Sequence, residues 1–175
     1  MLRTFRLQTC TGNAQPLFGD VLTAAFSNVQ NNDNYFSVKV ADTTLYKVGD
    51  RIVLGVGQAG QNIVLVSQIF SSTVLYVQSE GNAPLSYWGN NTIIALSMAC
   101  ADIILTANPT NVDTLWIGSD NTVTSAGAGN VIGALTPSFP PFRFTGNGQW
   151  NAIRTTDGWL AGLAGQQFIA TFEQI

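Results

Sequence analysis

Short apolar runs separated by glycine and asparagine recur along this 175-residue chain, and their spacing constrains the fold more than any other feature. From Tyr35 onward the runs recur roughly every 8–12 residues, which is the spacing of strands in a small barrel or sandwich. No window keeps apolar residues at positions i, i+3, i+4 and i+7 across three helical turns. The sequence therefore predicts an all-β fold with little helix.

The expected strands form two groups. The first group comprises residues 36–40, 51–54, 63–70, 73–78 and 92–96, with Ser71 and Ser72 as a two-residue hairpin connection. The second group comprises residues 103–106, 114–117, 131–135, 139–144, 152–155 and 166–172. Nearby prolines cannot donate to a strand ladder, so the segment 139–144 is expected at a sheet edge or in an extended segment.

The polarity pattern restarts at Asp102, which places a junction at residues 98–100. We therefore expect two small β-barrel or β-sandwich modules in tandem, residues 35–98 and 99–175, after an irregular N-terminal arm of residues 1–34. The arm either reaches a neighbouring subunit or folds as an edge strand onto its own domain, and the sequence leaves both interpretations open.

Charged residues make up only 10% of the chain, against about 25% in typical proteins. Little self-repulsion therefore opposes contact between surfaces, which favours a chain that packs into an assembly. The seven lysines and arginines are scattered, so we expect no nucleic-acid partner. The apolar runs are far shorter than a membrane-spanning helix and the N-terminus lacks a signal-peptide pattern, so we expect no membrane partner and synthesis in the cytoplasm.

Residues 55–60 match the dinucleotide-binding pattern G-x-G-x-x-G, and Glu80 follows about 20 residues later. A dinucleotide-binding loop must open a helix against the pyrophosphate. Here the β-branched segment 63–66 follows instead. We therefore predict a loop that joins two antiparallel strands and binds no nucleotide.

Catalytic and metal-binding chemistry is poorly supported. The chain has no histidine, which excludes Ser-His-Asp and Cys-His systems and removes the commonest transition-metal ligand. Cys10 and Cys100 are far apart; two buried small side chains are favoured, and their pairing stays open. Several carboxylates sit at expected turns: Asp42, Asp50, Asp113, Asp120 and Asp157. A calcium loop at Asp113, Asp120 and Asn121 lacks the usual ligand spacing. We expect no enzyme activity, cofactor or metal.

Tryptophan is the other candidate functional side chain. Trp150 and Trp159 lie in expected loops, in Gly148-Gln149-Trp150 and Gly158-Trp159, and could be exposed glycan contacts. Trp116 alternates with apolar neighbours and is expected to be buried. A core or subunit-interface role is favoured for these residues over glycan contact.

Residues 101–135 carry one further pattern. An apolar strand at 103–105 leads into the turn Ala107-Asn108-Pro109-Thr110-Asn111, and the short strand Thr114-Leu115-Trp116-Ile117-Gly118 follows. This order resembles a β-module of tailed-phage structural proteins, in which an A-x-P-x-N turn precedes a V/I-x-I/V-G strand. The segments 48–54, 63–69 and 73–77 are similar to a small β-barrel module of such proteins.

The resemblance implies a non-enzymatic capsid decoration (cement) protein that binds and stabilises the outer surface of the assembled head. Its implied partners are the major capsid protein and further copies of itself, usually as a trimer. It would be made in the host cytoplasm and located on the capsid exterior of the virion. The alternatives are a neck, tail or fibre-base protein, or a glycan-binding module of a phage fibre.

We expect the capsid and subunit contacts to come chiefly from residues 2–26. The candidate apolar anchors are Phe5, Leu7, Leu17 and Phe18, and the candidate polar partners are Arg3 and Arg6. Deleting this segment is expected to leave the C-terminal strands folded and to abolish capsid binding.

Overall fold

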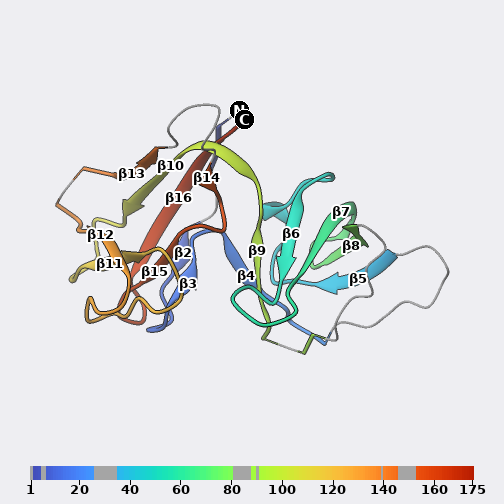
Figure 1. The fold of residues 1–175 in the computed structure, drawn as a ribbon, viewed down its shortest axis with the longest axis horizontal. Coiled ribbons are helices and arrows are strands. Elements are labelled where there is room, and N and C mark those ends of the chain that lie inside the picture. The colour runs from blue at the N-terminus through green and yellow to red at the C-terminus, as the bar shows by residue number, and fades with distance from the viewer. Residues whose placement is uncertain are drawn as a thin grey trace. The chain divides into compact units, whose positions relative to one another are not determined.

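The computed structural model describes residues 2–4, 7–25, 35–80, 88–89, 91–138, 140–145 and 153–175. This part of the chain is all-β, as the strand spacing predicts, with one 3-10 turn, η1 (Thr43–Leu45), and no α-helix (Figure 1). The strands are β1 (Leu2–Thr4), β2 (Gln8–Thr9), β3 (Gln15–Pro16), β4 (Gly19–Val21), β5 (Tyr35–Lys39), β6 (Arg51–Leu54), β7 (Asn62–Ser71), β8 (Val74–Ser79), β9 (Ile93–Leu96), β10 (Ala99–Ala107), β11 (Leu115–Gly118), β12 (Val131–Leu135), β13 (Phe142–Thr145), β14 (Ile153–Arg154), β15 (Trp159–Ala161) and β16 (Gln167–Gln174).

The chain forms two compact units, one of which is inserted into the other. The split unit consists of Met1–Phe18 and Met98–Ile175, and the inserted unit consists of Gly19–Ser97. The return to the split unit after Ser97 lies beside the junction expected at residues 98–100. The expected arm of residues 1–34 is instead divided between the two units, because its strands pair in both of them.

The inserted unit is a partly closed barrel. Its sheet has the order β4-β9-β6-β7-β8-β5. The two edge strands approach at one point, where Leu22 and Val40 form a bridge and the Thr23 N–H donates to the Lys39 carbonyl at 3.0 Å. The enclosed core contains the buried side chains of Val38, Ile52, Leu54, Val64, Val66, Leu75, Val77, Ile94 and Leu96.

The β7–β8 hairpin turns one residue later than expected. Ser71 pairs with Val74, so Ser72 and Thr73 form the connection. The turn is held by η1, because the Thr43 N–H donates to the Ser72 carbonyl at 3.0 Å and the Thr43 hydroxyl donates to the Ser71 carbonyl at 2.8 Å. These bonds fix Ser71 within the strand.

The split unit is a sandwich of two antiparallel sheets. The first has the order β1-β16-β10-β13, with β14 on β10 and β2 on β16, and the second has the order β12-β11-β15-β3. Side chains of the two sheets meet at Gly133 of β12, where an added Cβ would overlap the ring of Phe142 on β13. The sandwich core includes Leu105, Leu115, Ile117, Leu160, Phe168 and Phe172.

The N-terminal strands belong to these sheets. Strands β1 and β2 both pair with β16, and β3 pairs with β15. The structure therefore agrees with the interpretation in which the N-terminal segment folds onto its own domain, since β1, β2 and β3 all pair within the split unit.

Strand β13 lies at an edge of the first sheet and pairs with β10 alone among the described residues, as the flanking prolines predict. Five short strands are missing from the two groups of expected strands: β1, β2, β3, β4 and β15. Strands of two or three residues are too short to display a period-2 alternation.

Candidate functional site

Two of the predicted contact residues, Leu17 and Phe18, lie in the core of the split unit with 0% of their surface exposed. The Phe18 ring packs edge to face against Phe172, with 5.0 Å between the ring centroids. The Leu17 side chain fills the space beside Gly158, where an added Cβ would overlap it. The prediction that these residues are surface anchors is therefore corrected: the sandwich core uses both side chains.

The other predicted contact residues differ in position. Arg3 is half-buried, with its guanidinium carbon 5.4 Å from the centroid of the Phe172 ring, which is a cation–π contact. Leu7 is 44% exposed. Phe5 and Arg6 lie outside the described residues. Within the part of the chain that the structure describes, Arg3 and Leu7 remain as candidates for contact with a partner.

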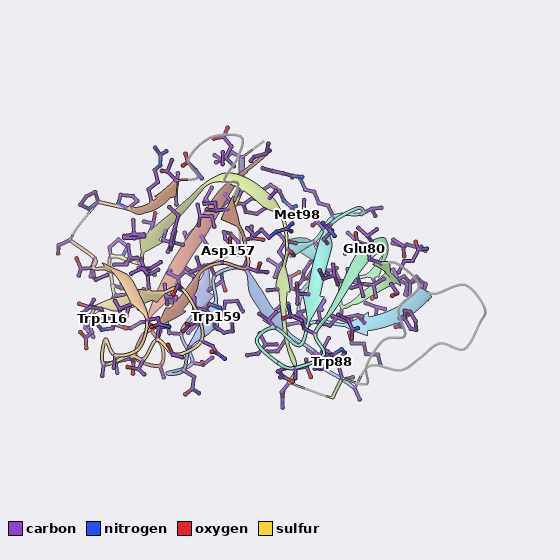
Figure 2. All side chains as sticks on the ribbon, in the orientation of Figure 1. Glu80, Trp88, Met98, Trp116, Asp157 and Trp159 are labelled. Atoms are coloured by element: carbon purple, nitrogen blue, oxygen red, sulfur yellow. The ribbon has the colours of Figure 1, made fainter. Side chains whose placement is uncertain are left out.

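The tryptophans predicted as exposed loop contacts do not form a glycan platform among the described residues. Trp159 is only 6% exposed, because it begins β15 and lies between Pro16 of β3 and Gly118 of β11. Figure 2 shows its side chain within the split unit. The prediction of an exposed Trp159 is corrected, and Trp150 lies outside the described residues.

Trp116, which was expected in the core, is half-buried on the outer face of its sheet. Its neighbours Leu115 and Ile117 are fully buried, so the alternation along β11 directs Trp116 to the opposite side. Gly127 packs against the indole, since an added Cβ there would lie 2.7 Å from the Trp116 Cε2 atom. The indole lies at the periphery of the split unit in Figure 2.

The glycine-rich segment 55–60 connects the antiparallel strands β6 and β7, as predicted. Gly55 has a φ of +71°, and an added Cβ would overlap the ring of Trp88. The Trp88 indole N–H donates to the Asn62 side-chain oxygen at 3.0 Å, which fixes the ring over the loop. Glycine is thus required here by backbone conformation and by the close approach of an aromatic ring.

The turn that carries the phage resemblance ties β10 to β16. The Asn111 side-chain amide donates to the Gln167 carbonyl at 2.8 Å, and its oxygen accepts the Gln167 N–H at 2.8 Å. The Asn108 N–H also donates to the Gln167 carbonyl, at 3.0 Å, and the Asn108 side-chain oxygen accepts the Thr110 N–H at 3.1 Å. The Asn111 side-chain amide therefore pairs with both backbone groups of Gln167, the first residue of β16, as the backbone of a neighbouring strand would.

Asn111→Ala is expected to lower the free energy of unfolding of the split unit by about 1–2 kcal/mol, because the Gln167 N–H loses the Asn111 acceptor while the Gln167 carbonyl keeps the Asn108 N–H as a donor. Urea denaturation should measure this loss. Asn121→Ala, at an exposed turn position, is the matched control and should change stability by less than about 0.5 kcal/mol. Equal effects of the two variants would contradict the role given to Asn111.

The carboxylates support turns, as predicted. Asp120 accepts hydrogen bonds from the Thr122 hydroxyl, the Asn130 side-chain amide and the Thr122 N–H, and these bonds lower its pKa. Main-chain N–H groups of their own turns donate to the other predicted turn carboxylates: Asp42, Asp50, Asp113 and Asp157. Among the described residues, no three His, Cys, Asp or Glu side chains are grouped as metal ligands.

Cys10 and Cys100 are separate, buried thiols of the split unit. Burial raises the pKa of Cys10 to about 11. Burial, with smaller contributions from the Asp157 and Asp102 carboxylates, raises the pKa of Cys100 to about 12. Both thiols therefore stay protonated and unreactive in the folded protein at neutral pH.

The stability of the split unit is expected to fall as pH rises above about 8.5, the ordinary range of a cysteine thiol. Above it the unfolded chain loses the thiol protons, whereas the folded chain keeps them up to pH values of about 11 and 12. Denaturation at pH 8 and at pH 10 should measure the loss. Cys100→Ala should reduce it relative to the native chain, and an equal loss in both would contradict this origin.

An exposed apolar surface on the inserted unit was not identified from the sequence. We define the hairpin face as Ile63, Leu65, Phe70, Val74 and Tyr76, on the outer side of β7 and β8. Phe70 is 60% exposed, Ile63 is 37% exposed, and the other three are half-buried. The rings of Phe70 and Tyr76 are 5.0 Å apart between centroids, at an interplanar angle of 42°.

A β-bulge places Phe70 on this face. The register of β7 and β8 shifts between Val66 and Gln68 and again between Ile69 and Ser71. After the first shift Gln68 is opposite Tyr76 on the outer side, so Phe70, two residues later, also lies on the outer side. The sequence carries a weak signal for this shift, because the apolar run of residues 63–66 is followed by two polar and then two apolar residues at 67–70.

Comparison of the chain with protein-family models, with curated proteins and with solved structures found no match. Within the described residues, no helix has the length and apolar composition needed to cross a membrane.

Proposed function

We propose that this chain is a non-enzymatic structural protein of a tailed-phage particle that binds and stabilises the outer surface of the assembled head. The observation that carries the proposal is the order of β10, the turn at residues 107–111 and β11, which is the order on which the resemblance rests. The turn residues Asn108 and Asn111 serve strand pairing, as expected of a structural module.

The surface of the described residues supports a role in an assembly. Charged residues are only 10% of the chain, and large apolar side chains are exposed in both units. Leu7 on the split unit and Phe70 on the inserted unit are examples. An exposed apolar side chain is stabilised when a partner removes it from water.

The mechanism is the preferential binding of an assembled shell. A protein that binds the shell and not its separated subunits stabilises it by RT ln(1 + [L]/Kd), which is about 2.7 kcal/mol at a free concentration of 100 Kd. The partners in this proposal are the major capsid protein and further copies of this chain, on the capsid exterior. The resemblance implies a trimer as the closed oligomer.

Co-sedimentation with emptied, expanded shells tests the proposal, and the expected result is saturable binding and a higher melting temperature of the shells. Leu7→Asp should weaken binding if the N-terminal surface takes part, and Leu163→Asp is the matched control. The two leucines are 44% and 47% exposed in the same unit. Absence of co-sedimentation would contradict the proposal.

Copy-number proteomics of the particle distinguishes the head, with hundreds of copies, from a neck, tail or fibre base, with far fewer.

A further inference from the structure

We propose that Cys10 and Gln166 condense to an internal thioester, which joins the N-terminal segment to the last strand of the split unit. The inference is independent of the proposed function, since it concerns a covalent bond within one chain. Cys10 and Gln166 extend the register in which Thr9 of β2 is opposite Gln167 of β16. The Cys10 N–H donates to the Gln166 carbonyl at 2.7 Å. Opposite residues of an antiparallel pair have Cβ atoms about 4.5–5.5 Å apart, so the two side chains are neighbours.

The two side chains meet at one buried position. Cys10 is 2% exposed and Gln166 is 6% exposed. A Cβ added to Gly162 would lie 3.1 Å from the Cys10 Sγ atom and 2.9 Å from the Gln166 Oε1 atom. Both atoms therefore approach the same point, and the absence of a side chain at Gly162 leaves the space for them.

The hydrogen bonds of the Gln166 amide prepare it for attack at its carbon. Its Oε1 atom accepts the Leu163 N–H at 3.0 Å, which polarises the carbonyl and stabilises negative charge on that oxygen. Its Nε2 atom is buried and has no hydrogen-bond partner among the described residues. An unpaired buried donor costs free energy. Loss of this nitrogen removes the unpaired donor and keeps the bond from Leu163.

The condensation needs no oxidant and no second reactant. The bond between the Cys10 Sγ and the Gln166 Cδ forms, and the bond between Cδ and Nε2 breaks. The thiol proton passes to Nε2, and the nitrogen leaves as ammonia. Burial then keeps water, which would hydrolyse the thioester, away from the bond.

The timing of the step follows from the state of the thiol. Thiolate is the nucleophile, and burial keeps the Cys10 thiol of the folded protein protonated at neutral pH. The reaction therefore takes place as β16 pairs with β2 during folding, while the thiol still has its ordinary pKa. Pairing of the strands holds the two groups together, and well-oriented intramolecular pairs reach effective concentrations of about 10⁵–10⁸ M.

Mass spectrometry of the full-length protein, unfolded in urea with N-ethylmaleimide, tests the inference. The native chain should be lighter than its sequence by one ammonia molecule and should carry the label on Cys100 alone. Cys100 is the internal control, since it is also buried but its thiol donates to the Ile153 carbonyl at 3.3 Å. Peptide mapping should find the peptides of Cys10 and Gln166 joined. Methylamine should separate them, restore the Cys10 thiol and leave a methylamide on Gln166.

Three variants complete the test. Cys10→Ala removes the nucleophile and Gln166→Glu removes the leaving nitrogen, so each should have the full mass of its own sequence. Cys100→Ala should still lose ammonia and carry no label. A native chain of full mass with both cysteines labelled overturns the inference. Loss of ammonia with both cysteines labelled also overturns it, because the ammonia then comes from a side chain that has not reacted with a thiol.

Discussion

Deleting residues 2–18 should prevent the split unit from folding and leave the inserted barrel folded. The deletion removes β1, β2 and β3 together with the fully buried Leu17 and Phe18. Strand β16 then loses two pairing partners, β1 and β2, and the sandwich core loses two large side chains. NMR spectra should show dispersed signals from the barrel and collapsed signals from the split unit. This outcome reverses the expectation that the C-terminal strands fold without the N-terminal segment.

A single substitution measures the same effect quantitatively. Phe18→Ala should lower the free energy of unfolding of the split unit by about 3–5 kcal/mol, because a buried ring is lost and a cavity remains. Phe70→Ala is the matched control, since that ring is 60% exposed, and should cost less than about 1 kcal/mol at protein concentrations that keep the chain monomeric. A small loss for Phe18→Ala would show that the ring does not belong to the core.

Gly55→Ala should destabilise the inserted unit by about 2–4 kcal/mol. The new Cβ would overlap the Trp88 ring, and a φ of +71° is unfavourable for alanine. Displacing the ring would also break its hydrogen bond to Asn62. Denaturant unfolding followed by tryptophan fluorescence should report both the loss of stability and the change around Trp88.

Gly49→Ala is the control that separates the two contributions. Gly49 also has a positive φ, of +90°, but an added Cβ would meet no atom within 4 Å. It should therefore cost only the conformational part, about 1 kcal/mol. If Gly55→Ala costs no more than Gly49→Ala, the contact with Trp88 does not explain the glycine.

The sequence predicts local structure better than long-range pairing. The strand expected at residues 51–54 has the same bounds in the structure, because a short apolar run bounded by turn residues is a local signal. The pairing of β1 with β16 joins opposite ends of the chain and has no local signature. Leu17 and Phe18 show the same limit. The sequence of an apolar pair in an irregular segment is the same whether the pair fills a core or contacts a partner, so the sequence does not distinguish the two roles.

Candidate contact residues were harder to predict for two further physical reasons. Trp159 follows a glycine and resembles a loop residue, since β15 is only three residues long. On a regular strand, alternate side chains point to the same side, so counting from Leu65 would place Phe70 on the inner side. The irregular register of β7 changes this count and places Phe70 on the outer side. Both depend on backbone geometry that arises from tertiary contacts.

The insertion of one unit into the other has a consequence for the order of folding during synthesis. The barrel is complete once residue 97 has left the ribosome, since all its strands lie within Gly19–Ser97. The split unit must wait for β16, which ends at Gln174 and pairs with β1 and β10. At about 5–20 residues per second, strand β1 is without its partner for roughly 8–34 seconds. The already folded barrel keeps Phe18 and Met98 near each other throughout, because Gly19 and Ala95 are paired, and so shortens the loop that the sandwich must close.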